Sequence, residues 1–358
     1  MRFKILQTDL AKYLRFADKI ANTNAISVSE KHLKLELTGN NLTLTCASST
    51  GSFIFVFPVY EGIADGLVCV SSKEIFKQVQ TYDKDDCLEF HLNEDILHLK
   101  VRKGKTKFKT LNSANYRIIS GTDVLAHYEV DVATVADLIS KSVFCVSKDD
   151  DRFKCVQLKS TATELTAYAT DGFRTITASL PHKSTEFSVV IPQATVRDML
   201  SGLALVSGSA KLSFSNNLVI EGADFKFVGN LNSFGFPEIK LFDNIKSEGS
   251  FSFVKKSLHS LMARAVAASE DDIFYISLNL SGNTLNCQIK TDLVEIDEDV
   301  DVNNPHNGQF EVGFNGKFLF EFLRTLEDDA EVEMIKQGFI CFFLTEKLKY
   351  AMVEVKLS

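Results

Sequence analysis

The chain has 358 residues, of which 45% are hydrophobic and 24% charged, and its formal net charge is −8. This apolar content excludes an intrinsically disordered chain and predicts two or three globular domains of ~100–200 residues each. The acidic balance argues against a polycation that coats nucleic acid or an anionic membrane, although it leaves room for a local basic surface. No apolar run approaches the ~20 residues of a membrane helix, and the first residues do not form a signal peptide, so we expect a cytoplasmic protein.

The residues that usually carry catalysis or bind metals are scattered. The seven cysteines include no CxxC pair, so we expect small buried side chains rather than disulfides or a zinc site. The seven histidines are equally dispersed, and none of the common nucleotide-binding or hydrolase motifs occurs. The sequence therefore predicts no catalytic residues, no metal and no cofactor.

The sequence repeats itself three times. Segments beginning at Phe3, Tyr128 and Phe251 share two strand-like apolar residues two apart, followed by apolar residues at the seventh and tenth positions after the start. This change of period indicates a strand that runs into an amphipathic helix. The pattern predicts three related domains of ~120 residues.

A second strand-helix opening recurs in each repeat at Val70, Ile191 and Phe314, followed by apolar residues five and nine positions later. Helix-start residues support it: Ser71 with Glu74 as a capping box, Pro192 in a first helical turn and Asn315 as an N-cap. Short alternating runs separated by turn residues follow each opening, which is typical of hairpins.

Each repeat is therefore predicted to hold two βαβββ units. The fold class is α+β, with three tandem domains at 1–122, 123–246 and 247–358, and with amphipathic helices laid against sheets.

Basic residues recur on the predicted helices of this acidic chain. One interpretation is a shared basic surface that contacts DNA phosphates without reading bases, and an ordinary solvated helix face is the alternative. The helix cations are Lys12, Arg15, Lys19, Lys73, Lys77, Lys141, Arg197, Lys255, Arg264, Lys317 and Arg324.

Two segments of opposite charge lie in different repeats. A predicted hairpin that turns at Gly104 carries Lys100, Arg102, Lys105, Lys107 and Lys109, and a segment of the third repeat carries Glu295, Asp297, Glu298, Asp299 and Asp301. Such complementarity favours head-to-tail association, which closes into a ring if the rotation permits. A lysine-protected edge strand is the alternative for the basic run, and a nucleic-acid-binding arm ranks third.

Three strings carry a family resemblance. They are ATDGFR at Ala169–Arg174, FEVGFNGKFLFEFLRTL from Phe310, and the terminal YAMVEVKLS. With the triplicated βαβββ plan, they resemble the β sliding clamp, the processivity subunit of bacterial DNA polymerase III. The 29 phenylalanines and the absence of tryptophan are typical of a divergent member. A bacterial, phage or plasmid origin stays open.

The resemblance implies a homodimeric ring of six domains, with helices lining a hole for duplex DNA and sheets outside. It implies no chemistry: the ring tethers the replicative polymerase for processive synthesis. The polymerase and clamp-loader subunits would bind through short apolar peptides. The subunit interface would use the two charged segments together with Phe108, Ala267 and Ala268.

The resemblance also implies a peptide pocket between the second and third domains. Its matching positions are Cys155, Thr170, Gly172, Phe173, Arg174, Thr175, Pro237, Phe242, Ile273, Asn315, Phe318, Phe339, Cys341, Ala351, Met352, Val353, Val355 and Lys356. Taken alone, Asp171-Gly172 indicates only a tight hairpin turn. The chain departs from the family at Phe173, where the family has His, and at Glu354, where the family has Pro.

A loop in the second repeat occupies a position where family members touch DNA. It makes Lys148, Arg152, Phe153 and Lys154 candidate contacts, although three consecutive Asp residues lie among them. Two other classes of function stay open. One is a repeat scaffold that assembles proteins without encircling DNA, and the other is an enzyme using Asp171 and Arg174, for which the sequence offers no nucleophile or metal cluster.

Overall fold

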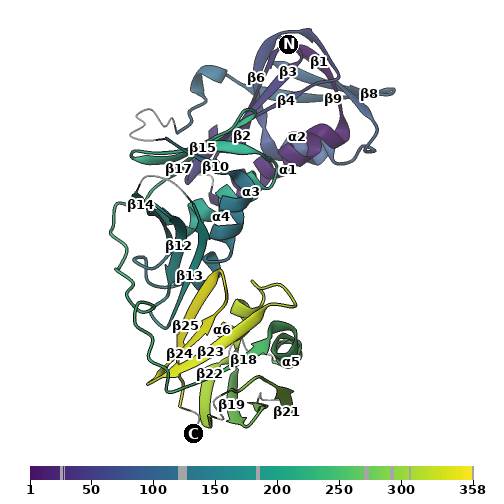
Figure 1. Cartoon of the computed structure of the whole chain (residues 1–358). Coiled ribbons are helices and arrows are strands. Elements are labelled where there is room, and N and C mark those ends of the chain that lie inside the picture. The colour runs from purple at the N-terminus through teal and green to yellow at the C-terminus, as the bar shows by residue number, and fades with distance from the viewer. Residues whose placement is uncertain are drawn as a thin grey trace. The chain divides into compact units, whose positions relative to one another are not determined.

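A computed structural model describes residues 1–24, 27, 29–119, 127–182, 186–269, 274–290, 294–305 and 308–356 (Figure 1). The chain divides into two compact units. Unit 1 is Met1–Asp137 with Ile191–Asn232, and unit 2 is Leu138–Val190 with Ser233–Ser358. Among the helices of these described ranges, none has both the length and the apolar character that crossing a bilayer requires.

Within the described residues, the element order follows the predicted βαβββ plan six times, with one additional strand, β5. The first repeat contains β1 (Arg2–Leu6), α1 (Gln7–Asn24), β2 (His32–Thr38), β3 (Asn41–Ala47), β4 (Gly51–Pro58), β5 (Glu61–Ala64), β6 (Gly66–Ser71), α2 (Ser72–Val79), β7 (Cys87–Asn93), β8 (Ile96–Val101) and β9 (Gly104–Leu111). The second contains β10 (His127–Asp131), α3 (Val132–Ser140), β11 (Cys155–Ser160), β12 (Glu164–Thr170), β13 (Arg174–Pro181), β14 (Phe187–Pro192), α4 (Gln193–Leu203), β15 (Ser209–Phe214), β16 (Asn217–Glu221) and β17 (Phe225–Asn230). The third contains β18 (Gly249–Val254), α5 (Lys255–Ala268), β19 (Tyr275–Ser281), β20 (Thr284–Lys290), β21 (Glu295–Asp301), β22 (Phe310–Asn315), α6 (Gly316–Leu323), β23 (Glu331–Gln337), β24 (Ile340–Leu344) and β25 (Leu348–Val353). Short 3₁₀ turns lie at Ser29–Lys31, Ser113–Asn115 and Val143–Cys145.

The predicted helix starts are largely confirmed. The Ser71 side chain accepts a hydrogen bond from the Glu74 amide at the start of α2, and the Asn315 side chain accepts one from Lys317 at the start of α6. Pro192 is the N-cap residue of α4 and so precedes the first turn in which it was predicted. The basic hairpin turns at Arg102-Lys103 rather than at Gly104, and Arg102 has a φ of 51°.

Unit 1 is built on one long sheet. Its strand order is β10-β15-β16-β17-β4-β3-β2-β6-β9-β8-β7-β1-β5. The antiparallel pairing of β17 with β4 joins strands of the second repeat to strands of the first, with Phe227 opposite Phe53. Helices α1 and α2 pack against each other (Figure 1). The apolar side of α1 is buried while Lys12, Arg15 and Lys19 are exposed, as its amphipathic pattern predicts.

The contact of α4 with the first repeat is close-packed. A Cβ added at Gly202 would lie 2.4 Å from Cε1 of Phe53 and 3.2 Å from Cζ of Phe16. We expect Gly202→Ala to lower the free energy of unfolding by about 1–3 kcal/mol, because both rings are buried and pack against further aromatic rings. Urea unfolding measures this change. Gly235→Ala adds the same methyl group where no atom lies within 4 Å, so it should leave the urea unfolding midpoint unchanged.

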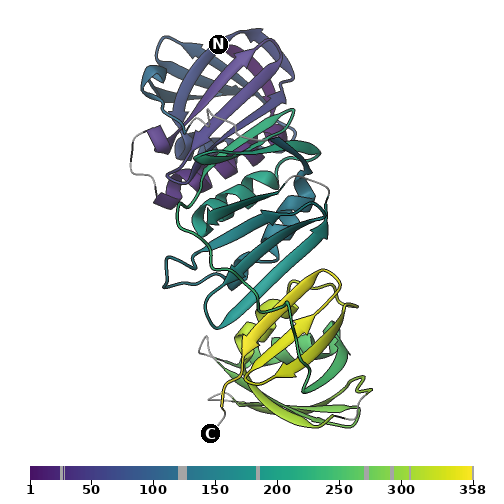
Figure 2. The same cartoon turned by 60° about the vertical axis from the view of Figure 1, so that its left-hand side comes forward.

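Unit 2 contains two sheets. Their orders are β14-β11-β12-β13-β25-β24-β23-β18 and β21-β20-β19-β22. Pairing of β13 with β25 places the C-terminal strand beside a strand of the second repeat (Figure 2), with Thr175 opposite Ala351. Beneath this junction, the Tyr350 ring stacks on Phe322 with centroids 4.6 Å apart, and both side chains are fully buried.

The predicted domain limits stay a prediction. Residues 120–126, which contain the first limit, lie outside the described residues. Strand pairing joins neighbouring repeats within each unit, so the compact units combine parts of adjacent repeats. The predicted repeats therefore describe the element order, whereas the units describe the packing.

Candidate functional site

The ATDGFR string forms a tight hairpin tip between β12 and β13. Gly172 has a φ of +92°, a conformation that favours glycine. The Asp171 carboxylate accepts hydrogen bonds from the backbone N–H groups of Phe173 (3.0 Å) and Arg174 (2.9 Å). This turn keeps the Phe173 side chain 64% exposed to solvent. The tight turn predicted from Asp171-Gly172 is confirmed.

A second hairpin tip lies on the other side of the C-terminal strand. The backbone N–H of Val353 donates to the carbonyl of Phe173 (3.0 Å), and that of Glu354 donates to the carbonyl of Phe339 (2.8 Å). Phe339 follows Gly338, whose φ is +59°, at the β23–β24 turn and is 71% exposed. Consecutive N–H groups of a strand point to opposite sides. The tail therefore runs between two hairpin tips, each of which carries an exposed phenylalanine.

One face of the sheet beside these tips is apolar. Thr175 lies opposite Ala351, which lies opposite Phe342, so these three side chains share a face. The segment after β17 crosses this face, and its Phe242 ring meets Phe342 edge-on with centroids 5.9 Å apart. Leu241 and Ile245 pack on the same cluster. Small side chains at 175 and 351, next to half-buried linker residues, offer a shallow apolar surface to a ligand.

Arg174 lies on the opposite, buried face of the hairpin. Its Nε donates to Asp171 Oδ2 (2.8 Å) and its Nη1 to Glu321 Oε2 (2.5 Å). Its guanidinium stacks on the Phe318 ring, 3.9 Å from the centroid. Burial by itself lowers the pKa of Arg174, but the contact with Glu321 raises it, and the net pKa lies above its usual range. The side chain is therefore a buried cation that is neutralised locally.

The predicted pocket residues consequently divide into two sets. The exposed or half-buried ones are Gly172, Phe173, Thr175, Pro237, Phe242, Asn315, Phe318, Phe339, Val353, Val355 and Lys356. The buried ones are Cys155, Thr170, Arg174, Cys341, Ala351 and Met352. Ile273 lies outside the described residues. The structure adds Glu321, which the sequence reasoning missed; its spacing of three from Phe318 on a helix was the available signal.

The two charged strands both present open edges. In unit 1, β9 pairs with β6 only at Thr110 and Leu111, which leaves the Gly104–Lys109 edge unpaired by β6, beside a cavity of about 430 Å³. In unit 2, β21 is the terminal strand of its sheet. Exposed Lys105, Lys107 and Lys109 alternate along β9, as exposed Asp297, Asp299 and Asp301 do along β21. The two edges therefore match in charge and in period.

Two residues predicted for the subunit interface are engaged inside the chain instead. Phe108 is only 5% exposed because it alternates with the lysines and points into the core. Arg102 Nη2 lies 2.7 Å from carboxylate oxygens of both Asp83 and Asp86, so its charge is neutralised locally. The other predicted positions, Lys100, Ala267, Ala268, Glu295 and Glu298, are exposed or half-buried, and Glu298 also pairs with Arg264.

The predicted DNA-facing residues fall into three groups. The exposed ones are Lys12, Arg15, Lys19, Lys73, Lys77, Lys148, Arg152, Arg197, Arg264 and Arg324, and the half-buried ones are Lys141, Phe153, Lys154 and Lys317. Arg152 and Lys154 pair with Asp150 (2.6 Å) and Asp151 (3.7 Å) of their own loop. Lys255 corrects the prediction: it is 5% exposed, because its ammonium turns inward to Asp328 Oδ1 at 2.6 Å.

The pair of Lys255 with Asp328 predicts a dependence of stability on pH. The hydrogen bond from Lys255 lowers the pKa of Asp328. This stabilisation is fully present above the pKa of an Asp side chain in the unfolded protein, about 3.9. It is lost as the pH falls through the lower pKa of Asp328 in the folded protein. We expect Asp328→Asn to destabilise unit 2 at pH 7 and to flatten the acid side of its stability profile. Urea midpoints from pH 7 to pH 3 measure this, with exposed Asp329→Asn as control; equal profiles would contradict the prediction.

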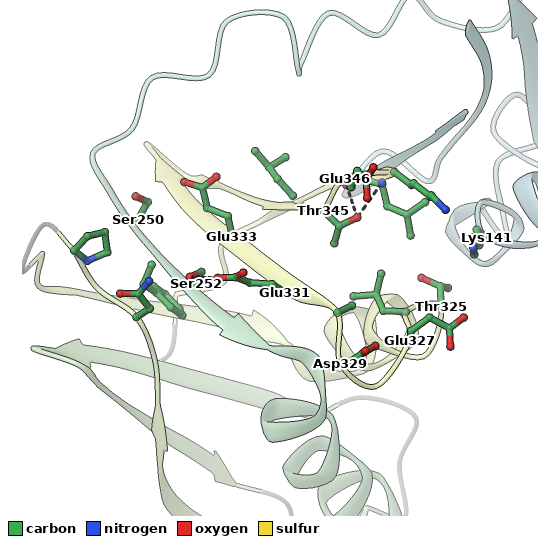
Figure 3. A pocket seen from close by; sticks show the side chains of 18 residues that line it. Lys141, Ser250, Ser252, Thr325, Glu327, Asp329, Glu331, Glu333, Thr345 and Glu346 are labelled. Atoms are coloured by element: carbon green, nitrogen blue, oxygen red, sulfur yellow. Dashed lines mark hydrogen bonds between the residues drawn. The ribbon is translucent and has the colours of Figure 1, made fainter. Parts of the chain in front are cut away.

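A larger cavity in unit 2 has an acidic lining. It has a volume of about 820 Å³ and lies along β18, β23 and the β24–β25 turn (Figure 3). Glu327, Asp329, Glu331, Glu333 and Glu346 line it, and these five carboxylates outnumber the two lysines of the lining, Lys141 and Lys347. Such a surface repels nucleic acid, so this side of the sheet does not suit contact with a phosphate backbone. Within the described ranges, no group of three or more His, Cys, Asp or Glu side chains is placed to hold a metal ion.

Comparison with known proteins identifies the fold. No family model matches the chain. The curated β sliding clamp of Haemophilus influenzae is 24% identical over 91% of both chains, and that of Vibrio cholerae is 22% identical over 93% of both. Among solved structures, the sliding clamp of Pseudomonas aeruginosa, titled DNA polymerase III subunit beta, has a TM-score of 0.90 at 18% identity, with full coverage of both chains. The DNA polymerase III β subunit of Thermotoga maritima has a TM-score of 0.86 at 16% identity, also with full coverage.

The chain is a divergent relative of the β sliding clamps. The structural match spans all three repeats, so the α+β clamp fold predicted from the internal repeats is confirmed. The clamp relatives also support the prediction of a non-catalytic protein.

Proposed function

We propose that this chain is the subunit of a DNA sliding clamp. Two copies close head to tail into a ring around duplex DNA, and the ring tethers the replicative DNA polymerase. The observation that carries the proposal is the full-length likeness to clamps, combined with two open strand edges of opposite charge in one chain. A head-to-tail pairing of these edges uses both of them in both copies and leaves neither free.

The mechanism is topological. A closed ring cannot leave DNA sideways, so a polymerase bound to it stays at high effective concentration at the primer end. Weak phosphate contacts from exposed helix cations such as Lys12, Arg15 and Lys73 are compatible with sliding, whereas tight binding would oppose it. The net charge of −8 fits the same arrangement, since an acidic exterior keeps DNA in the hole.

The tail and the two hairpin tips form the proposed docking site for partners. Exposed Phe173 and Phe339 and the apolar face at Ala351 suit a short peptide with apolar anchors. The polymerase and the clamp loader would use this one site in turn. This chain has Phe173 where the family has His and Glu354 where the family has Pro, and these replacements support a partner peptide matched to this chain. The clamp would act in the cytoplasm, where the DNA is replicated.

Retention on DNA circles tests the function. The chain, loaded on nicked circular DNA by a clamp loader, should stay bound through gel filtration and should be lost after the circle is cut once. Equal loss from circular and linear DNA would contradict a ring. A protein that never stays on circles but still binds polymerase would instead be the repeat scaffold.

A further inference from the structure

Arg174 joins four separate segments of the docking region. Its Nε and Nη1 reach Asp171 and Glu321, and its Nη2 donates to the carbonyl of Phe144 at 3.1 Å. The backbone of Arg174 lies opposite Met352 in the β13–β25 pairing, which adds the C-terminal strand. The guanidinium therefore links the hairpin, helix α6 and the turn at 143–145, and the backbone of the same residue pairs with the C-terminal strand.

All three guanidinium nitrogens are engaged inside the protein. The side chain is only 6% exposed, and the Phe318 ring covers one of its faces. A bound peptide could not displace these partners without leaving two carboxylates and a carbonyl unsatisfied. Arg174 therefore holds the site in place and does not bind the ligand itself.

Glu321 is the long-range member of this set. Asp171 belongs to the same hairpin as Arg174, so that contact fixes only the turn. Glu321 comes from α6, 147 residues further along the chain, and connects the hairpin to the third repeat. Its side chain is 27% exposed, so replacing it does not open a cavity in the core. Thr175 follows Arg174 on β13 and so points the other way, toward the proposed docking surface, and Phe173 precedes Arg174 at the exposed tip.

We infer that Glu321 is a positioning residue of the docking site. By holding Arg174 against α6, it fixes the direction in which the hairpin presents Phe173 and Thr175 beside the tail. The inference rests on the proposed function, because it concerns the same docking site, but it assigns a role to a residue that does not touch the peptide. Preorganisation of this kind raises affinity by reducing the ordering cost of binding.

The test compares three variants of the full-length protein. The probe is a fluorescein-labelled decapeptide with adjacent Leu and Phe anchors, and binding is measured by fluorescence anisotropy. We expect Glu321→Gln to raise the Kd about tenfold, since a hydrogen bond between charged groups is lost. Glu321→Asp, which keeps the charge, should recover part of the affinity. The matched control, Glu346→Gln, removes an exposed carboxylate of the same unit and should leave the Kd unchanged.

Hydrogen exchange separates positioning from a merely structural role. In Glu321→Gln, the amides of residues 170–176 should exchange faster than in the unmodified protein. The urea unfolding midpoint of this variant should equal that of the control, Glu346→Gln. A variant with unchanged affinity, or one whose loss of affinity follows a global loss of stability, overturns the inference. If the unmodified protein fails to bind the probe, the proposed docking function falls and takes the inference with it; retention on DNA circles, which does not use this site, would then still report on the ring.

Discussion

Changing Lys105 and Lys107 to Glu is expected to break the ring into monomers. Both side chains are exposed on β9, where the strand has an open edge, and they alternate as Asp297 and Asp299 do on β21. At each interface, the substitutions would turn two attractive contacts into two repulsive ones. Like charges placed opposite each other cost several kcal/mol of the free energy of association. We expect the dissociation constant of the dimer to rise by about 100-fold or more.

Sedimentation velocity over a range of protein concentrations measures the effect. Lys73→Glu with Lys77→Glu makes the same change of charge on exposed positions of α2 and should leave the dimer intact. Adding Asp297→Lys and Asp299→Lys to the first variant should restore association, because the edges then match with reversed signs. In the unmodified protein, added salt should weaken the dimer by screening the attraction. An unaltered dimer in the first variant would show that these edges do not meet.

Deleting residues 355–358 is expected to abolish binding of an apolar partner peptide. The backbone N–H of Val355 donates to the carbonyl of Gly313 at 2.8 Å, which ties the end of the tail to β22. Without this hydrogen bond, the residues around Val353 keep their contacts with the two hairpin tips but lose the tie to β22. We expect affinity to fall by about 30-fold or more, the size of effect that follows loss of an interface hot spot.

The fold should survive the deletion. Strand β25 ends at Val353, and its pairing with β13 and β24 lies entirely before the deleted residues. Circular dichroism and the urea midpoint should therefore match those of the full chain, and calorimetry with the apolar peptide should detect the loss of binding. Lys347→Ala, which keeps the chain length and removes one exposed side chain outside the predicted pocket, is the control. Retained affinity after the deletion would exclude the tail from the docking site.

The order of elements and the faces of the helices could be read from the sequence. Phe3, Tyr128 and Phe251 each lie in a strand, and each strand runs into a helix at the predicted place. Leu10 and Leu14 are fully buried on α1 while Lys12 is exposed. Such patterns are local: the period of apolar residues along a segment follows from the geometry of the helix or strand that buries one side of it.

Contacts between distant segments could not be read in this way. The sequence marks Lys255 and Arg102 as cations of a helix face and a hairpin, but each is paired with a carboxylate brought to it by another element. Phe108 lies among lysines in the sequence and yet faces the core, because the sheet puts alternate side chains on opposite sides.

The docking region shows the same division. The sequence by itself determined that Asp171-Gly172 makes a tight turn, since this depends on neighbouring residues. Only the tertiary structure decided that the C-terminal strand runs between two exposed phenylalanines, and that Glu321 reaches Arg174 across 147 residues of chain. A charged pair so far apart leaves no periodic signal, because its formation depends on how the sheets and helices pack rather than on the spacing of residues along one element.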